Sequence, residues 1–194
     1  MPAHGWAGWP KLWATAAREG KGRVHPAVTA PAAILRLNTE LLLNCLEGVD
    51  DGAANRAPAE GTNSIAFLTT HLIDSRHFLT AELGAPLENP LAGLLVGAKG
   101  IADVASLPPL DELRTHWNRV AAHLAVVVER LDTPALAAPG RRFPGSDGTA
   151  LGMLSFLAQH ESYHLGQVAL LRRQLGFPAM HYRLAPREPG RQGA

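Results

Sequence analysis

Residues 159–176 read QHESYHLGQVALLRRQLG, and this stretch joins a helical pattern to two histidines four positions apart. The apolar residues before and after the histidines recur every three or four positions, which is the spacing of one face of an α-helix. An i,i+4 pair such as His160 and His164 places its Cβ atoms about 5–6 Å apart. Two imidazoles at that separation can bind one ion with Zn–N distances of about 2.0–2.1 Å. The stretch therefore predicts a helix that carries part of a metal site.

Four long segments of the chain show helical spacing of apolar residues, and they are expected near 26–47, 64–83, 108–131 and 150–175. Thr62 or Asn63 is expected to cap the second helix, and Asp147 or Thr149 the fourth. Residues 50–61 and 133–148 are interpreted as loops. The connection 85–107 is long, with room for a short helix near 91–101. No segment alternates like a half-buried strand, so the sequence predicts an all-α four-helix bundle with a long crossover between helices two and three.

Composition and charge limit the classes of function. The 194 residues are 46% hydrophobic, enough for one substantial core, and the net charge of +1 comes without a basic cluster that would indicate nucleic acid. Cys45 is the single cysteine, so no intrachain disulfide can form and a cytoplasmic location is expected. No signal peptide is recognised, and no apolar run approaches the roughly 18–20 residues of a membrane span. We expect neither nucleic-acid nor membrane partners.

The chain divides into three parts by composition. Residues 1–25 form an N-terminal arm that contains three tryptophans, expected to pack on the main body: Trp6, Trp9 and Trp13. Residues 26–180 form the bundle domain. Residues 181–194 are rich in Pro, Gly and Arg and are expected to form a flexible tail.

A third histidine lies on the apolar stripe of the second helix. That stripe reads Phe67, His71, Asp74 and Phe78, and the corresponding stripe of the fourth helix includes His160, His164 and Gln167. Buried imidazoles need partners away from water, so three on facing stripes favour a metal ion over packing alone.

The remaining histidines are weaker candidates for metal ligands. His116 and His123 are seven positions apart, about 10.5 Å along a helix axis, which is too far for one ion. His77 lies on a different helix face from His71. His4 and His181 are expected at the surface, and nothing in the spacing of His25 places it near the site.

The segment HESYH also matches the HExxH pattern of zinc proteases, but its context argues against a protease. The extended zincin pattern requires Gly and His where this chain has Gln167 and Leu170, and the downstream Glu188 lies in the tail. No strand is expected that could hold a peptide. Glu161, rotated about 100° from His160 around the helix, is interpreted as reaching a metal-bound water or as simply solvated.

The segments NSIAFLTTHLIDSRHFL (63–79) and HESYHLGQVALLRRQLG (160–176) resemble the two signature helices of the DinB-like superfamily, which includes the YfiT-type metal-dependent hydrolases. The resemblance covers about residues 26–178. It implies a four-helix bundle with a long crossover and a metal triad of His71, His160 and His164. It also implies zinc or nickel as the ion, with iron or manganese as further candidates. Family habit and an apolar surplus, which includes Leu94, Leu95 and Val96 and the three N-terminal tryptophans, favour a homodimer. Several members of the superfamily use a low-molecular-weight thiol.

Two functions follow as alternatives. The first is a metal-dependent hydrolase or thiol-dependent transferase that acts on a small molecule, because three imidazoles leave a coordination position open. In this function Gln167 and Glu161 are the candidate catalytic residues, and Gln167 would orient water or substrate. The second is a non-catalytic stress-response bundle in which the ion only staples the core. Asp74 is expected to orient a histidine ligand or to pair with Arg76, and Tyr163 to pack or to donate a proton.

Overall fold

The computed structural model describes residues 24–182, and this part of the chain is helical without a named strand. The long helices are α2 (Thr29–Leu46), α4 (Ile65–Glu82), α5 (Leu110–Glu129) and α7 (Ala150–Gln174). The short ones are α3 (Asp51–Asn55), α6 (Thr133–Ala137) and two 3-10 turns, η1 (Pro26–Val28) and η2 (Ile101–Asp103). The predicted all-α class is confirmed. Most of the predicted N-terminal arm, with its tryptophans, and nearly all of the tail lie outside the described residues.

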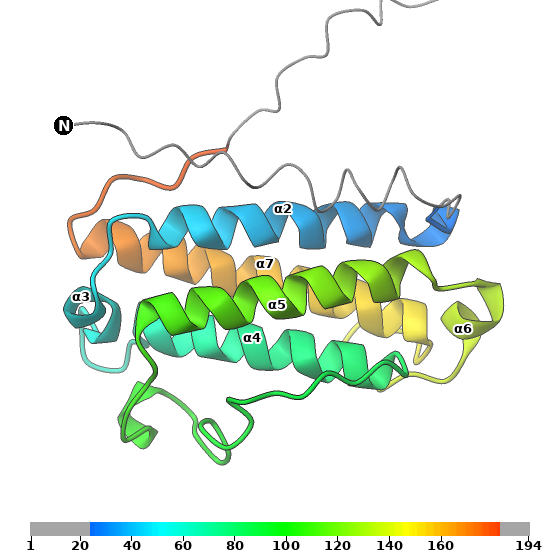
Figure 1. Cartoon of the computed structure of the whole chain (residues 1–194), viewed down its shortest axis with the longest axis horizontal. Helices are drawn as coiled ribbons and strands as arrows, with labels where there is room; N and C mark the ends of the chain where they lie inside the picture. The colour runs from blue at the N-terminus through cyan, green and yellow to red at the C-terminus, as the bar shows by residue number, and fades with distance from the viewer. Residues whose placement is uncertain (1–23, 183–194) are drawn as a thin grey trace, which may run out of the picture.

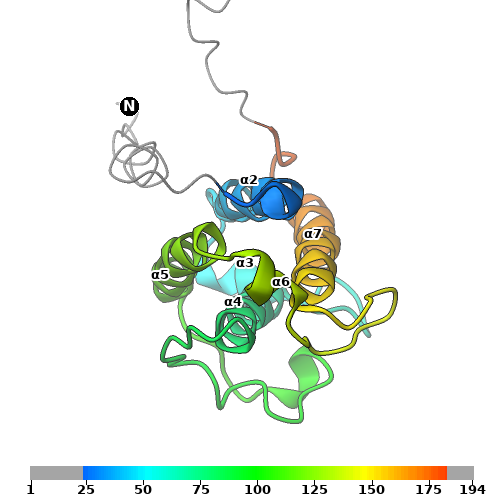
Figure 2. The same cartoon turned by 90° about the vertical axis from the view of Figure 1, so that its right-hand side faces the viewer.

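The four long helices form a bundle with a square cross-section. Seen along the bundle axis, α2 and α4 occupy one diagonal of the square and α5 and α7 the other (Figure 2). Each helix therefore packs against two neighbours, and α4 lies next to both α5 and α7. The short helices α3 and α6 lie at opposite ends of the bundle (Figure 1).

The long crossover sets the direction of the helices. After α4 the chain returns along the outside of the bundle to the end where α4 began, so α4 and α5 run parallel and α4 and α7 run antiparallel (Figure 1). Side chains hold the crossover in place: His77 Nδ1 bonds to Leu87 O at 3.1 Å, and His123 Nε2 bonds to Ala85 O at 2.8 Å. Asn89 donates to Asp74 at 2.8 Å, which ties the crossover to α4.

The helix starts follow capping chemistry, with two corrections to the expected pattern. Thr149 caps α7 by accepting from Gly152 N, as predicted, whereas α4 is capped by Ser64, which accepts from Phe67 N, and not by Thr62 or Asn63. The expected loops at 50–61 and 133–148 each contain a five-residue helix. The side chains of Asp50 and Asp132 cap these two helices.

The core consists of two hydrophobic clusters separated along the bundle axis. The first cluster includes Leu42, Leu72 and Leu165, and the second includes Leu35, Leu79 and Leu154. Arg76 and Glu161 lie between them along their helices and are themselves buried, with 2% and 3% of their surface exposed. Among the described helices, none has the length and apolar character needed to cross a membrane.

Candidate metal centre

The three predicted histidines come together on one side of the α4–α7 interface. His71 projects from α4, and His160 and His164 project from consecutive turns of the antiparallel α7. The ring centroid of His71 lies 5.3 Å from that of His160 and 4.7 Å from that of His164. The ring centroids of His160 and His164 are 4.5 Å apart. One ring nitrogen from each histidine lies within 4.8 Å of the others. Residues 89 positions apart in sequence, His71 and His160, thus share one site.

His164 is oriented by a side chain one turn further along α7. Its Nδ1 lies 2.7 Å from Oε1 of Gln167, and Gln167 Nε2 donates to the Tyr163 hydroxyl at 3.3 Å. Because Gln167 Oε1 can only accept, Nδ1 of His164 carries the proton and Nε2 presents its lone pair to the site. Gln167 therefore holds a histidine, which refines the expectation that it orients water or substrate.

His160 has a ring nitrogen that the protein leaves without a partner. Its Nε2 lies 3.1 Å from Nε2 of His164, while its Nδ1 is buried with no hydrogen-bond partner among the described residues. The two nitrogens of one imidazole point in different directions, so an ion bound by Nε2 would leave Nδ1 without a partner. The 3.1 Å separation of the two Nε2 atoms suits two nitrogens bound to one ion at about 2.0–2.1 Å, which are about 2.8–3.4 Å apart at coordination angles of about 90–109°.

Two of the imidazoles, those of His71 and His160, are held in the neutral form that binds metals. Burial, together with the nearby His164 and His160, lowers the pKa of His71 from 6.5 to about 4. Burial and His164 lower the pKa of His160 as well. At neutral pH a metal ion therefore needs to displace few protons from these two ligands.

Among the described residues, no fourth His, Cys, Asp or Glu completes the group. Within residues 24–182, His71, His160 and His164 are the only set of three or more His, Cys, Asp or Glu side chains close enough to hold an ion. All three are half-buried. A closed structural zinc site has four protein ligands, whereas this group has three. The donor set fits a divalent ion that keeps at least one position for a non-protein ligand.

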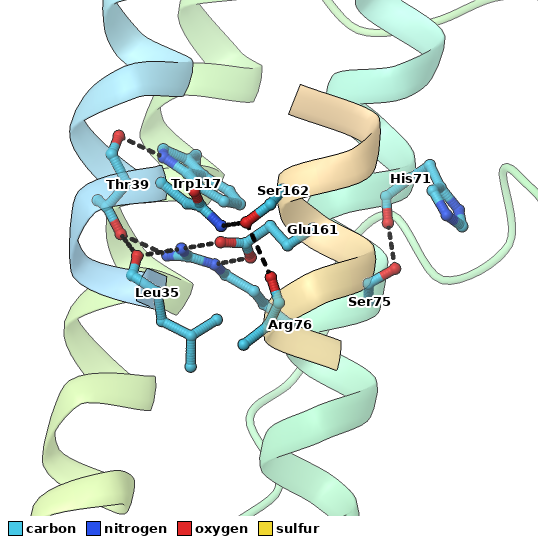
Figure 3. Close-up of polar contacts among 10 residues, drawn as sticks. Leu35, Thr39, His71, Ser75, Arg76, Trp117, Glu161 and Ser162 are labelled. Atoms are coloured by element: carbon cyan, nitrogen blue, oxygen red, sulfur yellow. Dashed lines mark hydrogen bonds and ion pairs between the residues drawn. The ribbon is translucent and has the colours of Figure 1, made fainter. Parts of the chain in front are cut away.

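Glu161 does not face the histidines. The sequence suggested that it reaches a metal-bound water or is solvated, and both interpretations are wrong. Both of its carboxylate oxygens accept from Arg76, at 2.7 and 2.8 Å, and it is 3% exposed. Figure 3 shows this pair on the inner side of α7, while His71 projects away from it on the far side of α4. A carboxylate held in this way has no free lone pair directed at the histidines, so Glu161 is not placed to act as a catalytic residue there.

The core-facing stripe of α7 differs by a small rotation from the one expected. The residues that are buried on this helix include Leu154, Leu157, Glu161, Leu165 and Val168. His160, His164 and Gln167 lie on the shoulder of that stripe and are half-buried. The shoulder position leaves the site at the edge of the core, where a ligand can approach.

Arg76 is the residue that sequence reasoning missed. It occupies the buried stripe of α4 with Leu72 and Leu79, as Glu161 does on α7. Arg76 and Glu161 each stand at a position of the apolar spacing of their helix, and their charges are opposite. This pattern could have predicted a buried ion pair.

The other candidate side chains have structural partners away from the cluster. His116 lies 3.4 Å from Glu112, and His25 bonds to Thr133. Asp74 accepts from Asn89 and not from Arg76. Burial raises the pKa of the Cys45 thiol to about 12, so this thiol is neither a ligand nor a nucleophile at neutral pH.

An open groove lies at the start of α7, and none of the three histidines lines it. It has a volume of about 510 Å³ and is lined by residues 144–147 and by side chains that include Leu151, Phe156 and Gln159. Phe156 lines the groove, its ring centroid is 6.0 Å from that of His160, and its ring stacks on Phe143 at 4.5 Å. The volume is in the range of small-molecule sites, about 300–1,000 Å³.

Comparison with known protein families identifies the superfamily to which this sequence is similar. The sequence model of the DinB superfamily matches residues 34–168, which is well over half of the chain and includes all three histidines. No curated protein matches the chain. The matched region spans the whole of α4 and α5 and most of α2 and α7.

Proposed function

The chain belongs to the DinB superfamily, and from this premise we propose that it binds one divalent ion through His71, His160 and His164 and uses the ion to transform a small molecule. The reaction class is hydrolysis or transfer to a low-molecular-weight thiol. Zinc and nickel are the first candidates for the ion, because neutral imidazole suits both, and iron or manganese come next.

One observation carries the proposal: three half-buried imidazoles converge on one point, and no fourth protein ligand closes the group within the described residues. A divalent ion held there would supply a Lewis acid with a position open to water, a thiol or substrate. The alternative function, an ion that only staples the core, would be favoured by a closed fourth ligand. The three-histidine set therefore supports catalysis over stapling.

The protein side chains prepare this site before any ion arrives. Gln167 holds His164 in the tautomer that directs Nε2 inward, at a contact of 2.7 Å. Burial lowers the pKa values of His71 and His160, which favours their neutral form at neutral pH. The groove beside Phe156 offers room for the body of a substrate next to His160. A thiol, if used, must come from outside, since Cys45 is fully buried.

The test measures substrate turnover by the protein with the ion bound, removed and restored. The full chain, loaded with Zn²⁺ or Ni²⁺, is screened with ester and amide substrates, and with low-molecular-weight thiols against electrophilic substrates. We expect turnover in one class that disappears on chelation and returns with the ion. The matched control is His164→Ala, which should lose both the ion and the activity.

Two results would count against this function. If the wild-type chain takes up no divalent ion, the three-histidine site itself is refuted. If it takes up one ion per chain with no turnover, and the ion has four protein ligands, the stapling alternative is correct.

A further inference from the structure

Arg76 is a buried cation that contacts three other helices. From α4 it donates Nε and Nη2 to Glu161 of α7, and it donates Nη1 to the Thr39 hydroxyl of α2 at 2.9 Å. Its Nη2 also donates to Leu35 O at 2.9 Å. The guanidinium lies over the Trp117 ring of α5 at 3.6 Å, and Trp117 Nε1 donates to Thr39 O (Figure 3). Four of the five N–H groups of the Arg76 side chain therefore donate to acceptors on α2 and α7.

The ion pair of Arg76 and Glu161 is the polar connection between α4 and α7, the two helices that carry the histidines. Among the described residues, every hydrogen bond between α4 and α7 joins Arg76 to Glu161. The pair also lies between the two hydrophobic clusters of the core, where apolar side chains alone would tolerate sliding. A bidentate ion pair has a narrow geometry and does not tolerate sliding.

The pair is close in sequence to the candidate ligands on both helices. Glu161 directly follows His160, and Arg76 comes five positions after His71. A shift of one residue along a helix moves its side chains by about 1.5 Å and turns them by about 100°. The register that brings Arg76 to Glu161 is thus the register that brings His71 to His160 and His164.

Buried ion pairs contribute little net stability, because desolvation offsets their attraction, and their best-attested use is to specify register. We propose that Arg76 and Glu161 are positioning residues that set the register of α4 against α7 and thereby assemble the three-histidine site. This inference rests on the proposed function. It gives the glutamate of HESYH a role different from the general base that the HExxH pattern suggests.

The test compares metal affinity with fold stability, using Co²⁺ alone as the probe. The double variant Arg76→Met/Glu161→Leu removes both charges with little change in volume, so we expect a melting temperature close to that of the wild type. Its Co²⁺ affinity, measured by competition with a chromophoric chelator, should fall at least tenfold. The visible absorption spectrum of bound Co²⁺ should also change, because the ligand arrangement differs.

A matched control separates positioning from general destabilisation. Leu136→Ala opens the second core cluster from α6, away from the pair, and it should lower the melting temperature while leaving Co²⁺ affinity unchanged. An equal loss of affinity in this control would overturn the proposal. Wild-type affinity and spectrum in the double variant would also overturn it, while the proposed metal site would stand.

If the double variant does not fold, Glu161→Gln provides the test of the positioning role. This variant keeps the size of the side chain and removes its charge. The folded fraction should bind Co²⁺ at least several-fold more weakly than the wild type, and unchanged affinity would refute the positioning role. A wild-type chain that binds no Co²⁺ would instead refute the metal site on which this inference rests.

Discussion

The contact between Gln167 and His164 is the clearest example of how a single residue prepares the site. The 2.7 Å bond fixes both the tautomer and the ring orientation of His164. Metal-bound histidines almost always donate their second ring N–H to such a partner, and loss of the partner typically weakens metal binding by about 10–100-fold. Gln167 provides that partner from one turn away on the same helix.

We expect Gln167→Ala to lower the affinity for Zn²⁺ by about 10–100-fold while the protein stays folded. The physical reason is that His164 would then be free to rotate and to change tautomer. Competition with a chelator measures the affinity. Gln159→Ala is the control, because Gln159 is an exposed glutamine on the same helix and should leave the affinity unchanged. Equal affinity for Gln167→Ala and the wild type would contradict this role.

At the scale of residues, local spacing predicted the histidines but not the environment of Glu161. His160 and His164 are four positions apart on one helix, so their proximity follows from helix geometry alone. The partner of Glu161 is 85 positions away in sequence, on another helix. Which of two adjacent stripes of α7 faces the core depends on the packing of that helix against its neighbours, which spacing within one helix does not determine.

At the scale of elements, the start of α7 is fixed by the chain that precedes it. Gly140 N donates to Gly148 O at 2.8 Å, Ala150 N donates to Ala138 O at 2.9 Å, and an isolated bridge pairs Pro139 with Thr149. A Cβ at Gly140 would lie 2.6 Å from the Thr149 carbonyl oxygen, which is backbone and cannot rotate away. Gly140 is therefore required by close approach.

We expect Gly140→Ala to reduce the free energy of unfolding by about 1–3 kcal/mol, the usual cost of forcing extra atoms into a packed site. Urea denaturation measures the change. Gly93→Ala is the control, because a Cβ there would meet no atom within 4 Å, and its effect should stay within about 0.5 kcal/mol. A neutral Gly140→Ala would show that this junction adjusts freely and that it does not fix the start of α7.

The long helices were predictable and the short ones were not. Four apolar stripes of about 20 residues gave α2, α4, α5 and α7 to within a few positions. The helices α3 and α6 have five residues each, too few to show a period. Their capping residues, Asp50 and Asp132, are also ordinary loop residues, so the capping signal alone did not distinguish a helix from a turn.

At the scale of the whole molecule, the expected homodimer remains a prediction. Of the apolar residues that suggested it, Leu94 and Leu95 pack partly against the core, whereas Val96 is 82% exposed. We expect light scattering of the full chain at about 50 μM, well above the constants of stable dimers, to give twice the mass of one chain. The mass of a single chain at that concentration would contradict the prediction.

The account depends above all on one ion bound between α4 and α7. The most direct test is an anomalous difference map, recorded at the zinc edge, from crystals of the full chain grown with Zn²⁺. We predict a single strong peak within about 2.0–2.1 Å of one nitrogen each of His71, His160 and His164, with a further position held by a non-protein ligand. A map without a peak at these histidines, although Zn²⁺ was present, would contradict the account.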